Sequence, residues 1–370
     1  MILLEGGREF FPSLAQAIES SQADVFLQTY ILADDAIGKQ IMAALTQAAR
    51  RGVAVHLLAD AFGTGALPST FSSPLLASGG KTLFWRTGGF LPRRKHLERL
   101  HRKLAVVDGR LAFIGGINLK DDLAPGFAPY PRLDYALRIE GPLVHDAFLL
   151  ARDTWNLMAK RVQKPWLCFP VLENRAQPKG DTPAALIART KASDRNIENT
   201  YLELISLAKK EILIANAFFL PTKAFCQALF DAARRGVRVI LLLQGKIEYF
   251  WIYYATQALY TWFGRQGVEV YEFLPAYLHA KVAVVDTRFF TLGSSNLDPL
   301  SLFHGLEANV VAEDPVLAAQ LRQGLFLALA QGGVAGQARL GHLGQRLFAR
   351  ASHGLLAMLG HLSRQKGKEE

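Results

Sequence analysis

Two blocks of the sequence carry the same reactive residue types at the same spacing. Residues 101–118 and 279–296 each begin with a histidine, followed by a lysine two positions later and an aspartate seven positions later, and each block ends in Gly-x-x-Asn. Unrelated segments would not agree at His, Lys, Asp, Gly and Asn together. The agreement indicates an internal duplication, with one block in each half of the chain.

The first block predicts a cationic site that can bind a phosphate group. The apolar run 104–107 is typical of a strand, on which residues two positions apart point to the same side, so His101 and Lys103 project together. A hairpin returning along 111–114 would bring Asn118 alongside them. The second block predicts the same arrangement for His279, Lys281 and Asn296.

Two such units facing each other would suit chemistry at a phosphodiester. The lysines and amides would hold the nonbridging oxygens, while one imidazole attacks phosphorus and the other protonates the leaving oxygen. This chemistry needs no metal, and the sequence offers no obvious cluster with metal-ligand spacing. We therefore expect neither a metal nor another cofactor.

The elements that must position these residues are repeated as well. Residues 48–58 and 232–242 both begin Ala-Ala-Arg-Arg-Gly-Val, and each follows a stretch with apolar residues at helical spacing. The arginine pair suits the negative end of a helix, and the glycine suits the residue just beyond it. The strand-like runs that flank the two helices are 25–27, 53–58, 212–214 and 237–243. The order strand–helix–strand, found twice, predicts parallel βαβ units.

We therefore predict an α/β fold made of two duplicated units. The first unit takes residues 1–162 and the second takes 196–335. Residues 163–195, which include several Pro, Gly and polar residues, are expected to be a linker region, and 336–370 a basic amphipathic tail.

The composition favours a polyanionic partner. The 42 Lys and Arg exceed the 32 Asp and Glu, and the net charge of +10 suits nucleic acid, anionic lipid or phosphorylated substrates. Half of the residues are hydrophobic, which excludes disorder for most of the chain. Neither a signal peptide nor an apolar run long enough to span a membrane is evident. The two cysteines, Cys168 and Cys226, are expected to be reduced and buried.

The paired blocks resemble the two signature motifs of the phospholipase D superfamily, and within it the chain is similar to bacterial cardiolipin synthases. The similarity also includes Leu-Leu-Glu-Gly-Gly at 3–7, Gly-Ser-Ser-Asn-Leu-Asp-Pro-Leu-Ser at 293–301 and Leu-Glu-Ala-Asn at 306–309. It extends from about residue 3 to about residue 325. The resemblance implies two α/β sandwich units packed as a pseudo-twofold pair, with the active site between them.

The resemblance also implies a role for each matching position. His101 would form a covalent phosphohistidine, and His279 would act as general acid and then as general base. The residues that would hold phosphate oxygens are Lys103, Lys281, Asn118, Asn296 and Ser294. Because Gly116 stands where the second block has Ser294, the hydroxyl contact would exist on one side only.

Four carboxylates complete the expected site. Glu307 follows His279 in the second half, and Asp134 follows His101 in the first half. The same resemblance implies that each would orient the imidazole of its own half by accepting its other N–H, although Asp134 also fits a surface carboxylate on a strand. Asp108 and Asp286 complete the catalytic motifs, and we expect them to order the turns rather than touch phosphate.

Three segments bear on the choice of substrate. The aromatic segment 250–263 suits a membrane interface, or else a helix buried against the sheet. The basic segment 86–103 suits anionic headgroups or DNA phosphates. The tail combines leucines at helical spacing with cations, which suits an anionic leaflet or packing on the body.

We therefore expect a cardiolipin synthase-type phosphatidyltransferase that joins two phosphatidylglycerol molecules to give cardiolipin and glycerol. The partner would be an anionic phospholipid membrane, with the protein bound peripherally at the cytoplasmic face of the bacterial inner membrane and no obligate protein partner evident. The alternative is a phosphodiesterase that hydrolyses phospholipid or nucleic acid. A lipid-binding scaffold with a degenerate site ranks last, because both motifs are intact.

Overall fold

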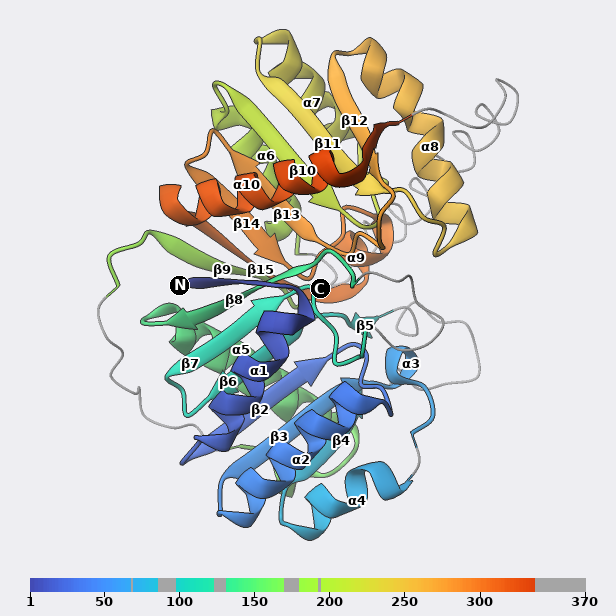
Figure 1. Cartoon of the computed structure of the whole chain (residues 1–370). Helices are drawn as coiled ribbons and strands as arrows, with labels where there is room; N and C mark the ends of the chain where they lie inside the picture. Colours follow the sequence, from blue (N-terminus) through green and yellow to red (C-terminus); the bar gives the residue numbers. More distant parts are fainter. Residues whose placement is uncertain (68, 86–97, 123–130, 170–179, 192–193, 337–370) are drawn as a thin grey trace, which may run out of the picture.

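Two layered α/β units stack one above the other (Figure 1). The computed structural model describes residues 1–336 apart from 68, 86–97, 123–130, 170–179 and 192–193. The first sheet runs, in spatial order, through β1 (Ile2–Glu5), β8 (Tyr135–Glu140), β7 (Leu111–Gly115), β6 (Lys103–Val107), β2 (Asp24–Thr29), β3 (Ala54–Asp60) and β4 (Lys81–Trp85).

The second sheet has the same strand order as the first when read from the opposite edge, with β16 (Gly333–Ala335) and β5 (Arg99–Leu100) added. It runs through β16, β12 (Val268–Phe273), β11 (Arg238–Gln244), β10 (Glu211–Asn216), β13 (Lys281–Val285), β14 (Phe289–Gly293), β15 (Gly305–Glu313) and the short β5. β2, β3 and β4 are parallel to one another, as are β10, β11 and β12, so the predicted parallel βαβ units are confirmed.

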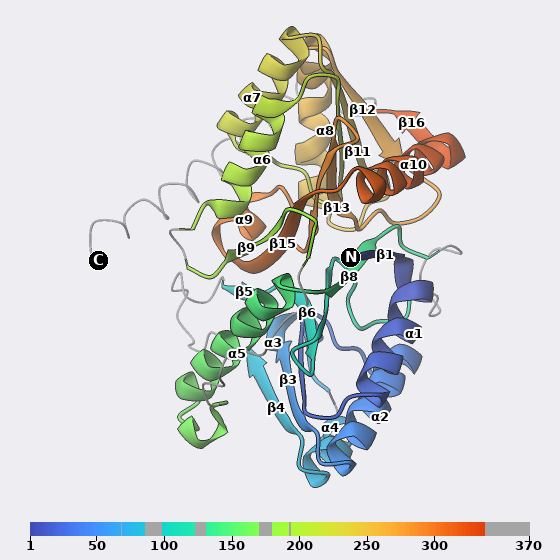
Figure 2. The same ribbon diagram turned by 90° about the vertical axis from the view of Figure 1, so that its left-hand side faces the viewer.

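Helices cover both faces of each sheet. The first unit contains α1 (Gly6–Glu19), α2 (Ala36–Arg50), α3 (Ala61–Thr64), α4 (Ser69–Ala77), α5 (Leu143–Arg161) and the 3₁₀ turn η2 (Pro165–Leu167). The second contains α6 (Asn196–Leu207), α7 (Lys223–Arg234), α8 (Phe250–Arg265), α9 (Pro299–Phe303) and α10 (Pro315–Gly332). Figure 2 shows α5 on the side of α6 and α7, and α10 on the side of α1 and α2, as two units related by a pseudo-twofold axis require.

The repeated arginine pairs tie helices of each unit together. α2 ends at Arg50 and α7 at Arg234, and the following glycines, Gly52 and Gly236, have positive φ angles of 90° and 86°. The second arginine of each pair donates to backbone carbonyls at the end of the preceding helix, Arg51 to Ile18 and Arg235 to Ile205. In both units the Arg-Arg-Gly sequence therefore ends one helix, and its second arginine caps the helix that precedes it in the chain.

The segment expected to be a linker contains a strand. β9 (Ala184–Arg189) pairs antiparallel with β15, as β1 pairs with β8 in the first unit. The structural repeat therefore begins before residue 196. The Pro- and Gly-rich residues ahead of β9 gave this segment the composition of a loop, whereas the open edge of β15 provides hydrogen bonds that extend the sheet.

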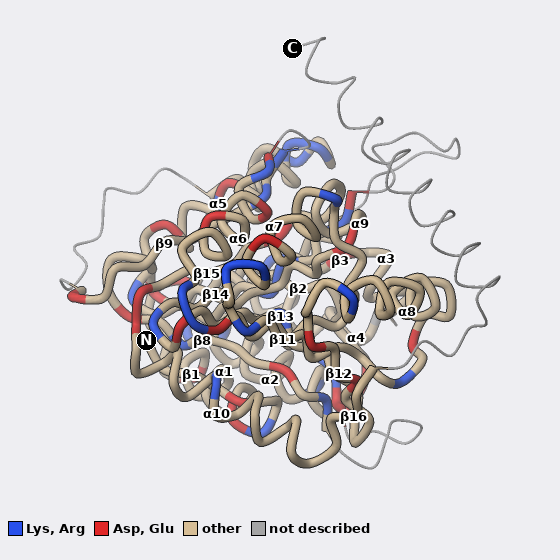
Figure 3. The backbone as a smooth tube through the Cα atoms, turned by 90° about the horizontal axis from the view of Figure 1, so that it is seen from above, with Lys and Arg blue, Asp and Glu red and all other residues tan. Residues whose placement is uncertain are grey.

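The basic tail and most of the basic segment 86–103 lie outside the described residues. Most of the excess of basic over acidic residues is in 86–97 and 337–370, and Figure 3 shows Lys and Arg interspersed with Asp and Glu along the described backbone. Among the described helices, none is long and apolar enough to cross a membrane.

The aspartate of each motif anchors a turn at the far end of its strand from the histidine. Asp108 and Asp286 adopt positive φ angles of 52° and 55°. The Asp108 carboxylate accepts hydrogen bonds from the backbone N–H groups of residues 22–24, and Asp286 accepts from those of residues 209–211. Although the two aspartates complete the catalytic motifs in the sequence, they order turns in the structure, because their oxygens already bind the backbone of the neighbouring loop.

Replacing Asp286 with alanine should destabilise the protein without removing its chemistry. Three backbone N–H groups would lose their acceptor, so we expect a loss of about 2 kcal/mol in the free energy of unfolding. Denaturant titration measures this loss. Asp153→Ala, which removes an exposed carboxylate paired with Arg152, is the matched control and should change stability by less than about 0.5 kcal/mol. A native denaturation curve combined with an inactive Asp286→Ala protein would instead place this carboxylate on the substrate.

Candidate active site

Each histidine lies beside a chain segment of the other unit. β5 leaves its own sheet and pairs in parallel with β15, and the N–H groups of His101 and Arg102 both donate to the Leu306 carbonyl, at 3.1 and 2.8 Å. On the other side, the His279 N–H donates to the Leu133 carbonyl at 2.8 Å. Leu306 and Leu133 are each followed by a carboxylate, so the backbone exchange brings a histidine and a carboxylate together twice.

The two imidazole–carboxylate pairs both cross between the units. The His101 Nδ1 lies 2.8 Å from Glu307 Oε1, and the His279 Nδ1 lies 2.6 Å from Asp134 Oδ2. The expectation that each carboxylate orients the imidazole of its own half is therefore wrong. Sequence separation had suggested that pairing, whereas the exchanged backbone segments place each carboxylate opposite the other unit's histidine.

Gly116 and Ser294 occupy equivalent positions and support the two carboxylates in different ways. A Cβ on Gly116 would lie 2.2 Å from an Asp134 oxygen, so only glycine leaves room for this carboxylate. In the second unit the Ser294 hydroxyl donates to Glu307 Oε2 at 2.5 Å and is fully buried. The hydroxyl is indeed on one side only, but it binds the carboxylate, which corrects its expected contact with phosphate.

Both lysines are buried beside the imidazoles. Lys103 Nζ donates to the His101 carbonyl at 2.6 Å and lies 5.3 Å from the Tyr30 ring. Lys281 Nζ donates to the His279 carbonyl and lies 2.9 Å from His279 Nδ1. Burial lowers the pKa of Lys103 to about 7 and that of Lys281 to about 8, because the charged form loses its water.

The asparagines differ in what they already bind. Asn118 is partly buried, and its side-chain oxygen accepts from the Ile31 N–H at 3.2 Å. Asn296 is 3% exposed, and among the described residues its side-chain oxygen has no hydrogen-bond partner. Both retain an amide nitrogen that can donate to a phosphate oxygen, so the structure leaves their predicted role open.

The two pairs differ electrostatically. Burial would raise the pKa of Glu307, but His101 and Lys103 outweigh it, and the pKa lies below its usual value. For Asp134 burial dominates and raises the pKa to about 7. Burial lowers the pKa of both imidazoles, and Lys281 and Arg132 lower that of His279 further. His101 thus faces an ionised carboxylate, whereas His279 faces a carboxyl group that titrates near neutrality.

The sequence of this chain is similar to those of known proteins. The family model described as "Cardiolipin synthase, PLD-like domain" matches residues 14–124 and 201–325. Cardiolipin synthase B of Escherichia coli K12 is 39% identical over 328 residues, which cover 87% of this chain and 78% of that protein. This chain belongs to the cardiolipin synthase family of phospholipase D-like proteins.

More distant members of the cardiolipin synthase family match as well. Cardiolipin synthase A of Pseudomonas syringae is 31% identical, with 86% of this chain and 66% of that protein covered. Among solved structures, phosphatidylserine synthase of Haemophilus influenzae superposes with a TM-score of 0.71 at 14% identity, covering 96% and 94% of the two chains. The last likeness concerns the fold alone, and it confirms the predicted α/β architecture of two units.

Several residues at this cardiolipin synthase-type site were not predicted. The Tyr30 ring lies 4.8 Å from the His101 ring, and Arg132 pairs with Glu248 at 3.1 Å beside the second histidine. Arg102 is 1% exposed, donates to Thr154 at 3.0 Å, and has two further guanidinium nitrogens without a partner among the described residues. The only sequence signal for Arg102 was its place between the His and the Lys of the first motif. No sequence signal pointed to Tyr30.

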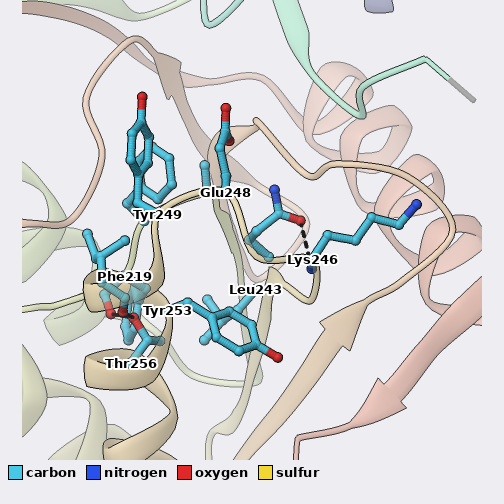
Figure 4. Close-up of a pocket in the computed structure, with 11 residues that line it drawn as sticks. Phe219, Leu243, Lys246, Glu248, Tyr249, Tyr253 and Thr256 are labelled. Carbon is cyan, nitrogen blue, oxygen red and sulfur yellow. Dashed lines mark hydrogen bonds between the residues drawn. The ribbon is translucent and has the colours of Figure 1, made fainter. Parts of the chain in front are cut away.

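A narrow pocket lies beside the site in the second unit. It is small, with a cavity volume of about 20 Å³, and lies at the carboxyl ends of β10 and β11 and the start of α8 (Figure 4). The lining residues are Ala217, Phe218, Phe219, Leu243, Gln244, Lys246, Glu248, Tyr249, Ile252, Tyr253 and Thr256. Asn216, immediately before the pocket in the sequence, lies opposite Lys281 in the sheet register, so the pocket adjoins this lysine. In Figure 4 Glu248 and Tyr249 point the same way, away from Phe219 and Thr256.

The crossed pairing can be tested by histidine titration. Asp134→Asn should change the ¹⁵N shifts and tautomer of the His279 ring and leave His101 nearly unchanged, because Asp134 touches only the former. Glu307→Gln should do the reverse. NMR of the histidine-labelled protein measures both rings in each variant, so the variants serve as controls for each other. Perturbation of the histidine in the same half as the substitution would contradict the crossed geometry.

Proposed function

We propose that the protein is a phosphatidyltransferase that joins two phosphatidylglycerol molecules into cardiolipin and glycerol through a phosphohistidine. The observation that carries this proposal is the pair of imidazoles, His279 buried and His101 partly buried, each held by a carboxylate from the opposite unit and flanked by a buried lysine. The names of the family and of its relatives support the lipid substrate.

His101 is the nucleophile in this proposal. The ionised Glu307 accepts a hydrogen bond from the Nδ1–H of His101, which keeps the proton on Nδ1 and leaves the lone pair on Nε2 free to attack phosphorus. The Nε2–P bond forms as the P–O bond to the glycerol headgroup breaks. Lys103 and Lys281, with the amides of Asn118 and Asn296, would hold the nonbridging oxygens while the phosphorus is pentacoordinate.

His279 supplies the proton that the departing glycerol needs. The Lys281 ammonium lies 2.9 Å from His279 Nδ1, and Asp134 titrates near neutrality, so the neutral ring carries its proton on Nε2. As Nε2 gives this proton to the glycerol oxygen, Nδ1 takes the carboxyl proton of Asp134, 2.6 Å away, so the imidazole stays neutral. After glycerol leaves, His279 removes the proton from a hydroxyl of a second phosphatidylglycerol. That oxygen attacks the phosphohistidine, the N–P bond breaks, and cardiolipin is released with His101 neutral again.

The charge of the substrate fits the site. Burial lowers the pKa of both lysines and both imidazoles, so the empty site tends to lose protons. A phosphodiester anion among these groups favours their charged forms and raises their pKa values. Binding of phosphatidylglycerol would thereby restore the cations that stabilise the transition state.

Water competes with the second lipid at the phosphohistidine. A hydrolase acting on phospholipid or nucleic acid would use the same residues, and it remains the second candidate function because the chemistry up to the intermediate is identical. Phe218, Phe219 and Ile252 place apolar side chains in the lining of the small neighbouring pocket, and this apolar edge of the site favours an alcohol carried by a lipid over water. We also propose peripheral attachment to an anionic phospholipid membrane, with the tail 337–370 as one contributor.

Purified protein should convert labelled phosphatidylglycerol into cardiolipin and glycerol and leave an oligonucleotide intact. His101→Ala and His279→Ala should each lower the rate by several orders of magnitude, because one removes the nucleophile and the other the proton carrier. Trapped, acid-labile phosphatidyl label should map to His101. Release of phosphatidate in place of cardiolipin would identify a hydrolase, and label on His279 would reverse the two roles.

The rate should depend on pH through the lysines. A lysine is charged below its pKa, and the values of about 7 for Lys103 and about 8 for Lys281 lie well below the ordinary value of about 10.4. We therefore expect kcat/KM for monomeric phosphatidylglycerol to decline as the pH rises from about 7 to 9, because kcat/KM reports groups of the free enzyme. Lys281→Arg keeps its charge throughout this range, so its slower reaction should decline less. A wild-type profile that stays level to pH 9 would contradict this.

A further inference from the structure

The loop before α8 and the first residues of that helix expose a group of large apolar side chains. Tyr249, Phe250 and Trp251 are 53%, 62% and 43% exposed, and Ile247 is exposed as well. Most of the helix beyond them packs against the second sheet, with Tyr253, Leu259, Tyr260 and Phe263 buried. The aromatic segment 250–263 is therefore a buried helix for most of its length, with exposed aromatic residues at its start.

These exposed residues lie next to the catalytic groups of the second unit. Phe218 lies two residues after Asn216, which is opposite Lys281 in the sheet register. The Phe218 ring lies 5.4 Å from the Tyr249 ring. Glu248 pairs with Arg132, which adjoins the segment that receives the His279 N–H. The start of α8 thus forms one border of the active site.

The first unit provides the opposite border. Phe62 in α3 is 70% exposed, with the Arg99 guanidinium 4.5 Å from its ring. Asp60 fixes α3 by accepting from the Phe62 N–H at 2.9 Å, and it also accepts from the Leu100 N–H at 2.8 Å, directly before His101. In Figure 1, α3 and the lower end of α8 both lie on the right-hand side of the molecule.

We propose that these five residues, Phe62, Ile247, Tyr249, Phe250 and Trp251, form an aromatic rim that inserts into the membrane interface and places the active site directly on the lipid surface. The inference rests on the proposed lipid substrate and adds the surface through which that substrate enters. A diacyl lipid cannot cross water without exposing its chains, so the site must open where the protein meets the bilayer.

The chemistry of the rim suits a bilayer. Tyrosine and tryptophan combine an apolar body with a polar end and are enriched at membrane interfaces, while phenylalanine enters the acyl region. Arg99 against Phe62, and Lys246 within 5.9 Å of the Tyr277 ring, place cations at the level of anionic headgroups. Because Lys and Arg are interspersed with Asp and Glu along the described backbone (Figure 3), we take apolar insertion to be the main attraction that this part of the chain offers to a bilayer.

Location distinguishes the rim from other exposed apolar residues. Trp166 is 72% exposed in η2, beyond α5 and away from the site, and Val316 and Leu327 are exposed on α10. Single exposed apolar residues are normal on protein surfaces. Trp166 therefore provides a control of the same chemistry as Trp251.

The test compares the double variant Phe250→Ser, Trp251→Ser with Trp166→Ser in the full chain. Co-sedimentation with vesicles of phosphatidylglycerol and phosphatidylcholine measures binding at low and high salt. The double variant should bind at least about tenfold more weakly, because two large apolar side chains are lost from the interface. Its deficit should persist at high salt, where charge-mediated binding is screened. Trp166→Ser should bind like the wild type.

Activity on two forms of the substrate provides the second measurement. The double variant should lose activity on phosphatidylglycerol in vesicles in proportion to its lost binding. It should keep near-wild-type activity on dihexanoyl phosphatidylglycerol below its micelle concentration, because neither residue belongs to the catalytic groups. The rim would be overturned if the double variant bound vesicles and reacted with them as well as Trp166→Ser does. It would also be overturned if both variants lost binding and activity to the same extent.

Failure of the rim and failure of the proposed function are distinguishable. Sedimentation requires no turnover, so rim-dependent vesicle binding by a wild-type protein that does not react with dihexanoyl phosphatidylglycerol would support the surface and reject the phosphatidyltransferase. Conversely, cardiolipin formation by a double variant that still binds vesicles normally would support the enzyme and reject the rim.

Discussion

The exchange of backbone segments between the two units is the constraint on which the site depends. β5 leaves its own sheet to pair in parallel with β15, and Leu133 of the first unit pairs in parallel with Leu278 of the second. Each exchange aligns a histidine of one unit with a carboxylate of the other. Neither unit alone therefore contains an oriented imidazole, and any shift between the units would separate both pairs at once. A rigid interface is thus a condition for catalysis rather than a by-product of packing.

The burial of several cationic groups costs hydration free energy in the empty site, and an anionic substrate can offset this cost. Lys281 is completely buried and Lys103 nearly so, and their Nζ atoms donate to backbone carbonyls. Carbonyl dipoles compensate only part of the hydration that an ammonium group loses. A phosphodiester anion supplies the missing negative charge, so much of the affinity for phosphate comes from relieving a cost already present in the folded protein.

The sequence predicted those features that depend on local chemistry. The duplication, the parallel units, the arginine-ended helices and the gathering of His101 with Lys103 all follow from spacing and periodicity. The crossed pairing of His101 with Glu307 does not, because spacing along the chain says nothing about which unit a side chain faces. β9 was hidden for a related reason: its stability comes from the edge of β15, a partner distant in the sequence.

The duplicated halves differ most clearly in the surroundings of the carboxylates that face the two histidines. In the first unit Gly116 leaves space for the shorter Asp134, and in the second Ser294 donates to the longer Glu307. A hydroxyl donor stabilises an ionised carboxylate, whereas a buried carboxylate without that donor is more readily protonated. In the proposed reaction, Glu307 is accordingly the better partner for the nucleophile His101, which must keep its proton on Nδ1 and attack through Nε2. Asp134, titrating near neutrality, is the better partner for an imidazole that must both give and take a proton. The two related units thus give their histidines different protonation behaviour, because the carboxylates that face them lie in different environments.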